Sequence, residues 1–318
     1  MSHYFTIPTN TNGIVTDLNA AGNFKSALNP PFTVSDVFIY SHGWWTSADS
    51  ALAGYNRFTI EFSTLTTPIL KANPTVLTKP PIDPLGVAIH WPSMIDDDSQ
   101  AVVDNFEAFS FYTMGQRANI VGANAVYALL RLVIQESPAT PKIHFIGHSF
   151  GCRVVCSAIQ EILKDAETIP QGQNLYIRAV LLEAAFDQND LEKNALYGGL
   201  SQMPNLKVLA TYSSLDTSLN KAYPLSQEIN IFKGSGGSNN ALGGVGPTDQ
   251  TAKDFGGMIK LIVGPGFSFA QSAAAQSRLV AADLSPLHEA NPNYGQTDHH
   301  SDIFHPEIYH LICGFLFQ

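Results

Sequence analysis

One pentapeptide, Gly147-His148-Ser149-Phe150-Gly151, constrains the fold more than any other feature of this chain. The apolar run KIHFI precedes it, and apolar residues recur at helical spacing after it, over positions 150–163. The pentapeptide therefore stands where a strand passes into a helix. Glycines on both sides of the serine allow a sharp turn without Cβ clashes. We expect a strained turn that presents the Ser149 hydroxyl above the edge of a sheet.

Apolar runs alternate with helical patterns along the rest of the chain. This alternation predicts an α/β fold with a mostly parallel central sheet and helices on both faces. We expect a single domain over residues 1–318, because no linker or internal repeat interrupts the pattern. The predicted strands are 36–41, 85–91, 142–146, 176–184, 206–212 and 279–284, and the predicted helices are 118–133, 150–163, 191–200 and 306–316.

The strongest compositional break is the glycine-rich segment KGSGGSNNALGGVG, residues 233–246. So much glycine and asparagine disfavours both a helix and a central strand. We expect a loop or insertion there, between the last two predicted strands, where it could border a binding site.

Charge and composition exclude several classes of function. The net charge is −10, from 17 basic and 27 acidic residues, and no basic cluster is present, which argues against nucleic-acid binding. We see neither a signal-peptide pattern nor an apolar run of the roughly 18 residues that a membrane span needs. We therefore expect a cytoplasmic protein, although a processed secreted chain would look the same. The three cysteines, Cys152, Cys156 and Cys313, are expected to be buried thiols.

A serine hydroxyl at neutral pH needs a neighbouring base, which in turn needs an orienting carboxylate. When the serine lies on a turn of this kind, the acid and then the histidine follow it along the chain. Asp216 comes just after strand 206–212, at the sheet edge where ligands bind in open α/β folds. Asp187, just after strand 176–184, is the alternative, and we favour Asp216.

The candidate base lies between the last strand and the closing helix. His300 is the preferred residue, and His299 and His305 are the alternatives. An acyl-transfer site also needs donors for an oxyanion. The backbone amides of Phe150, after the serine, and of Trp44, after a strand ending in His42-Gly43, suit this purpose.

The histidines and the nearby aromatic residues allow two other interpretations. His299, His300, Asp302 and His305 have metal-ligating side chains, but a metal hydrolase would not need the serine turn, and we expect neither metal nor cofactor. The acidic run Asp96-Asp97-Asp98 is interpreted as a solvated loop. Aromatic and basic residues near strand ends either line a substrate cleft or form the core edge: Trp44, Trp45, Trp91, Tyr112 and Arg117.

Together these residues resemble the α/β-hydrolase superfamily of serine hydrolases. From Val37 to Leu163, through HGWW, HWPS and GHSFGCRVV, the chain is similar to a poorly characterised bacterial branch of it. The resemblance implies hydrolysis of a small-molecule acyl ester through an acyl-enzyme, with Ser149, Asp216 and His300 as the triad and no cofactor. Lipases, thioesterases, amidases and acyltransferases share this machinery, and a binding protein could keep the fold without turnover. A lipase would need a lid, for which residues 233–246 and the apolar run Met258–Val263 are candidates.

Overall fold

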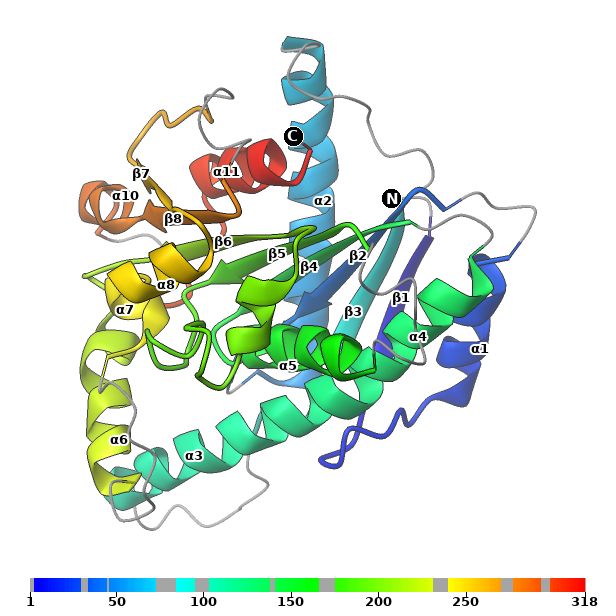
Figure 1. The fold of residues 1–318 in the computed structure, drawn as a ribbon, viewed down its shortest axis with the longest axis horizontal. Coiled ribbons are helices and arrows are strands. Elements are labelled where there is room, and N and C mark those ends of the chain that lie inside the picture. Colours follow the sequence, from blue (N-terminus) through cyan, green and yellow to red (C-terminus); the bar gives the residue numbers. More distant parts are fainter. Residues whose placement is uncertain are drawn as a thin grey trace.

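The computed structural model describes residues 3–29, 34–44, 46–72, 84–94, 103–137, 141–165, 175–230, 240–269, 277–292 and 298–317. At their centre lies a sheet of eight strands in which every neighbouring pair is parallel (Figure 1). Its spatial order is β1-β3-β2-β4-β5-β6-β8-β7. The strands are β1 His3–Pro8, β2 Asp36–Ser41, β3 Leu85–His90, β4 Lys142–His148, β5 Ile177–Leu182, β6 Leu206–Tyr212, β7 Ile259–Ile262 and β8 Leu279–Asp283.

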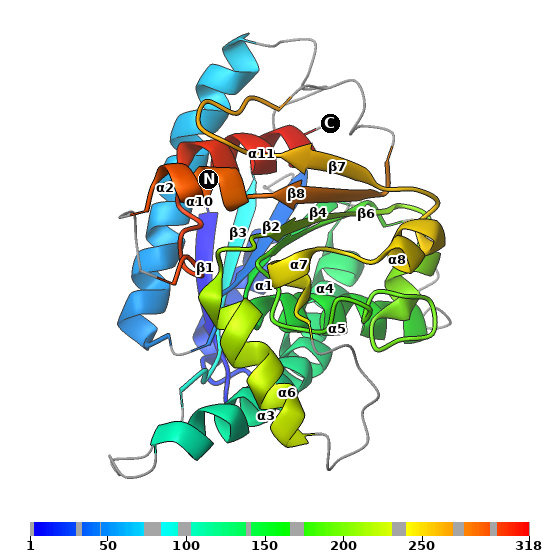
Figure 2. The same cartoon turned by 90° about the vertical axis from the view of Figure 1, so that its left-hand side faces the viewer.

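Helices cover both faces of the sheet, as predicted (Figure 2). Helices α2 and α11 pack together on one face, and α5 lies on the other face with α3 and α4 beside it. In β2, Val37 and Ile39 join the core under α5, whereas Phe38 and Tyr40 pack toward α2 and α11. Burial on both faces explains the continuous apolar strands. The α-helices are α1 Leu18–Ala27, α2 Ala48–Ala72, α3 Val103–Val121, α4 Tyr127–Glu136, α5 Gly151–Lys164, α6 Tyr223–Asn230, α7 Leu242–Val245, α8 Asp249–Asp254, α10 Ser285–Ala290 and α11 Pro306–Leu316.

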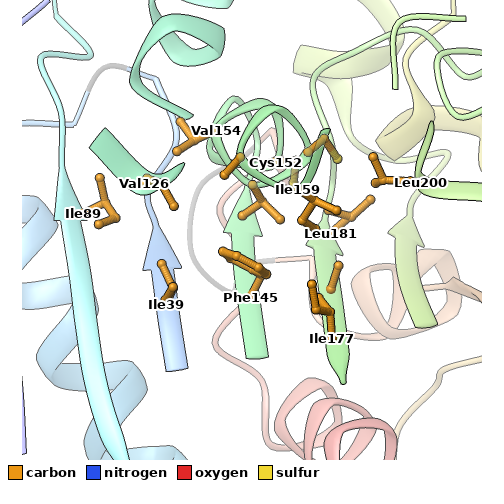
Figure 3. Close-up of a cluster of buried hydrophobic side chains, with 14 of the residues drawn as sticks. Ile39, Ile89, Val126, Phe145, Cys152, Val154, Ile159, Ile177, Leu181 and Leu200 are labelled. Atoms are coloured by element: carbon orange, nitrogen blue, oxygen red, sulfur yellow. The ribbon is translucent and has the colours of Figure 1, made fainter. Parts of the chain in front are cut away.

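Helix α5 begins directly after the serine turn and rests on the middle of the sheet. Figure 3 shows its residues Cys152 and Ile159 above Phe145 of β4 and Ile177 of β5. Cys152 and Cys156 are buried free thiols, as is Cys313 in α11, in agreement with the prediction. This packing fixes the start of α5 relative to the end of β4.

A single continuous helical segment combines α3, the π-helical turn η1 (Gly122–Val126) and α4. A Cβ on Gly122 would lie 2.2 Å from the Val154 carbonyl oxygen, so glycine permits close contact with α5. Contrary to the expectation from the sequence, residues Phe111–Glu136 are long and apolar enough to span a membrane by length and composition alone, and an 18-residue window within them has a mean hydropathy of 1.3. Such a helix is weak evidence for a span, and in this structure it packs against α5 and contributes Met114, Ala118 and Leu129 to the core.

The predicted helix over 191–200 is wrong. The chain instead makes successive turns, with Ala195 N donating to Glu192 O and Gly198 N to Ala195 O, and ends in the 3₁₀ helix η3, Gly198–Gln202. Asparagine and aspartate at its start and the glycine pair at its end favour turns over an α-helix.

Part of the glycine-rich segment is helical. Residues 231–239 lie outside the described part, as do Trp45 and Asp96–Asp98, but residues 242–245 form the one-turn helix α7. The candidate lid Met258–Val263 is also wrong, because Ile259–Ile262 form the edge strand β7, paired with β8. The segment between the last two predicted strands therefore includes one further strand of the sheet.

Candidate active site

The serine turn has the strained geometry that its sequence predicts. Ser149 has a φ of +55°, and its backbone is held by hydrogen bonds to Leu182, the last residue of β5, and to Ala185 just beyond it. The flanking glycines are required by close approach. A Cβ on Gly147 would lie 2.7 Å from Cys152 N, and one on Gly151 would lie 2.1 Å from Ser41 O. A non-glycine residue with positive φ at a sheet edge is typical of functional turns.

The structure brings Ser149, His300 and Asp216 together in one hydrogen-bonded chain. The His300 Nε2 atom lies 2.8 Å from Ser149 Oγ, and His300 Nδ1 lies 2.7 Å from Asp216 Oδ2. Asp216 is fully buried, and its other oxygen accepts the Leu219 amide at 2.9 Å. This second bond fixes the carboxylate, so the imidazole is held between an acceptor and a hydroxyl.

Two opposing effects act on the His300 imidazole. Burial lowers its pKa, whereas the charge of Asp216, the hydrogen bond to Asp216 and the charge of Asp298 raise it. The carboxylates prevail, and the pKa of His300 is raised above its ordinary value. The group is thus a stronger base than a free histidine.

The alternative acid and bases have other partners. The Asp187 carboxylate accepts a hydrogen bond from the Tyr223 hydroxyl at 2.9 Å. His299 Nδ1 lies 2.8 Å from Asp302 Oδ2, and His305 occupies the N-cap position of α11. The structure therefore places His300, and not His299 or His305, beside Ser149.

His148, the variable residue before the serine, was missed as a site residue. Burial, and then the neighbouring His300, lower its pKa to about 3, so its ring is neutral at ordinary pH. Its Nε2 atom lies 2.8 Å from the backbone oxygen of His300, to which it can donate a proton. It thereby ties the His300 loop to the serine turn. Its place beside Ser149 in the motif was the only signal in the sequence.

The turn after β2 touches the serine. A Cβ on Gly43 would lie 2.8 Å from the Ser149 Cβ, so the backbone at Gly43 lies against the turn. The segment after β3 holds this loop: Trp91 Nε1 donates to His42 O at 3.0 Å, and the Trp91 ring stacks on the His42 ring. The conjunction of HGWW with HWPS in the sequence thus corresponds to direct contact.

The second predicted donor, Phe150, lies at the N-terminal end of α5, as the N-cap residue. Its amide donates to no acceptor among the described residues. Together with the loop after β2, it provides backbone on two sides of Ser149.

A cavity of about 310 Å³ opens beside Ser149. Trp44, one of the residues that the sequence suggested for a substrate cleft, lines this cavity. Trp91 is fully buried, and Arg117 donates to the carbonyls of Pro92 and Met94. The described lining contains no lysine, arginine, aspartate or glutamate: it is Tyr40, His42, Gly43, Trp44, Thr46, Ser50, Ala51, Gly54, Phe111, His148, Ser149, Ser218, Ala222, His300, Ser301, Ile303 and Phe304.

Glu183, directly after β5, is a second residue that sequence reasoning missed. It has a φ of +46°, and its carboxyl group is fully buried close to His148 and His300. The sequence signal was an acid at the end of the apolar run YIRAVLLEA.

Ligand atoms of His148, Glu183 and His300 lie within 4.8 Å of one another, a spacing that could hold a metal ion. This is not the set His299, His300, Asp302 and His305 weighed from the sequence. A metal would have to displace existing hydrogen bonds, because His300 uses both ring nitrogens and His148 uses Nε2. We assign no metal to this group.

Comparison with curated proteins gives no match. A family model described as an α/β hydrolase of unknown function, DUF900, matches residues 33–232. This span covers β2 to β6 and includes the serine turn and Asp216. The match confirms the resemblance inferred from the sequence, and it covers more than half of the chain. The protein therefore belongs to the DUF900 family of α/β hydrolases.

Proposed function

We propose that this hydrolase cleaves carboxylic esters through an acyl-enzyme formed on Ser149. The observation that carries the proposal is the hydrogen-bonded chain from Ser149 Oγ through His300 to Asp216, with distances of 2.8 and 2.7 Å. A strained serine at a helix N-terminus beside a carboxylate-bound imidazole is the arrangement that nucleophilic catalysis requires.

In the proposed reaction, Ser149 Oγ attacks the acyl carbonyl as its proton passes to His300 Nε2. Asp216 stabilises the imidazolium, which then gives the proton to the departing alcohol oxygen. Water next attacks the acyl-enzyme with His300 as base, and the acid leaves as Ser149 regains its proton. The amides of Trp44 and Phe150 bind the oxyanion in both steps, and one such donor typically contributes about 10²–10³ in rate.

The cavity favours a small, uncharged substrate. Its volume of about 310 Å³ is at the lower end of the range for ligand pockets. No charged carboxylate, lysine or arginine in the described lining would bind an ionic group. Its aromatic residues, including Trp44, Phe111 and Phe304, suit an apolar acyl or alcohol group. We therefore expect short-chain esters to be better substrates than long-chain lipids.

The test is hydrolysis of p-nitrophenyl acetate by wild type and by Ser149→Ala, together with labelling by a fluorophosphonate. We expect Ser149→Ala to lose nearly all turnover and all labelling while it remains folded. Ser301→Ala is the matched control, because Ser301 lines the same cavity and should still allow labelling of Ser149. Labelling or turnover that persists in Ser149→Ala would reject the nucleophile, and an unlabelled, folded wild type would favour a non-catalytic binding protein.

A further inference from the structure

Glu183 has no role in the reaction proposed above, although its burial is energetically unfavourable. The Glu183 side chain is fully buried, and neither carboxyl oxygen has a hydrogen-bond partner among the described residues. An unpaired buried polar group costs about 1–3 kcal/mol, and more when it is charged. Such a group in a native structure requires an explanation.

The backbone of Glu183 is unfavourable as well. Its φ of +46° lies in the left-handed region, and its amide donates to Thr211 Oγ1 at 3.0 Å. Helix α7 packs tightly behind it, since a Cβ on Gly243 would lie 2.2 Å from the Glu183 carbonyl carbon. Strain of this kind persists where the surrounding structure imposes it, often at functional sites.

The carboxyl group lies close to two histidines of the site. One of its oxygens lies within 4.8 Å of a ring nitrogen of His148 and of a ring nitrogen of His300, and Oε1 lies 3.9 Å from His288 Nε2. Burial, and then the charges of the carboxylates that surround it, raise its pKa well above the ordinary value. These carboxylates are Asp216, Asp302 and Asp298.

We propose that Glu183 is a second acid for His300. Glu183 stays protonated while Asp216 carries the negative charge, and it carries that charge itself when Asp216 does not. The inference rests on the proposed function, because it concerns the same imidazole. Glu183 acts through His300 and does not contact the substrate, so it is a positioning residue. When it ionises, its proton passes to solvent, and the proton from Ser149 is still taken by His300.

The proposal has a direct consequence for loss of Asp216. Removing the Asp216 charge removes one cause that keeps Glu183 protonated. Burial and the charges of Asp302 and Asp298 still oppose ionisation of Glu183, but an imidazolium on His300, within 4.8 Å, favours it. The carboxylate that then forms stabilises that imidazolium. Without such a reserve, loss of the triad carboxylate typically costs about 10⁴ in turnover.

The test compares kcat/KM for p-nitrophenyl acetate in Asp216→Ala, Asp216→Ala/Glu183→Gln and Asp216→Ala/Asp187→Asn. Alanine is used at position 216 because an asparagine amide could hold the imidazole in the wrong tautomer. Asp187→Asn is the matched control, since this acid also follows β5 but bonds to Tyr223. We expect Asp216→Ala and the control to lose far less than about 10⁴-fold. We expect Glu183→Gln to remove most of the remaining activity.

A second readout does not depend on turnover. In histidine-labelled protein, NMR titration follows the pKa of His300, whose signal is assigned by its loss in His300→Gln. We expect the pKa of His300 to be higher in Asp216→Ala than in Asp216→Ala/Glu183→Gln. Equal pKa values in these two variants would overturn the proposal. A difference in pKa in a protein without esterase activity would instead reject only the proposed function. Asp216→Ser variants provide the same comparison if the alanine variants do not fold.

Discussion

The contact between Gly43 and the serine turn predicts a large effect from a single methyl group. In Gly43→Ala the new Cβ would lie 2.8 Å from Ser149 Cβ and 3.3 Å from His148 Nδ1. The carbon–carbon distance is roughly 0.7 Å below the ordinary contact limit of about 3.5 Å. The loop and the serine turn must therefore move apart.

The size of the effect follows from this overlap. Overpacking of a tight contact typically costs about 1–3 kcal/mol in the free energy of unfolding. Displacement of a reacting group by about 1 Å can reduce turnover by about 10²-fold. We therefore expect Gly43→Ala to lose on the order of 10²-fold in kcat/KM for p-nitrophenyl acetate, with a lower melting temperature.

Gly54→Ala is the matched control, because Gly54 lines the same cavity from helix α2. Its added Cβ would meet only Phe304 Cζ, at 3.9 Å, which is an ordinary contact. We expect it to stabilise the helix by about 0.5–1 kcal/mol and to reduce turnover far less than Gly43→Ala. Wild-type turnover in Gly43→Ala, or equal losses in both variants, would refute the steric reasoning.

Two further predictions follow from the site and the core. The base must be neutral and the pKa of His300 is raised, so kcat/KM should increase with pH with an apparent pKa above about 6.5. Asp298→Asn should shift this increase to lower pH, because the charge of Asp298 raises the pKa of His300. An apparent pKa at or below the ordinary value in the wild type would contradict this assignment. Gly122→Ala should destabilise the protein by about 1–3 kcal/mol in urea unfolding, since its Cβ would lie 2.2 Å from Val154 O. Gly22→Ala is the control and should not destabilise it, because its Cβ would have no neighbour within 4 Å. Similar urea midpoints for the two variants would count against the close helix contact.

The elements that could be predicted from the sequence share strong local patterns. Buried central strands such as β2 and β6 are mostly apolar, and the strand–glycine–serine–glycine–helix order defines the turn at Ser149. The edge strand β1 was not predicted, and the apolar run that contains β7 was interpreted as a lid, because a strand of only four partly exposed residues does not differ clearly from an apolar loop segment.

Site residues could be predicted where the order of elements along the chain indicates their position. They could not be predicted where only the packing of distant side chains does. Asp216 and His300 could be placed after particular strands, and they lie together in the structure. His148 and Glu183 could not be assigned, because their importance depends on which side chains from β6 and the loop before α11 surround them. Such contacts join residues far apart in the chain, and no local pattern encodes them.

The wide separation of the interacting side chains has a consequence for assays of folding. Ser149 and His300 are 151 positions apart, and His300 and Asp216 are 84 apart, so no local fragment can activate the hydroxyl. Parallel sheets with such non-local contacts form late and slowly. If the proposed function holds, covalent labelling of Ser149 detects only those molecules in which the native topology is complete. A collapsed intermediate with native-like helices would remain unlabelled.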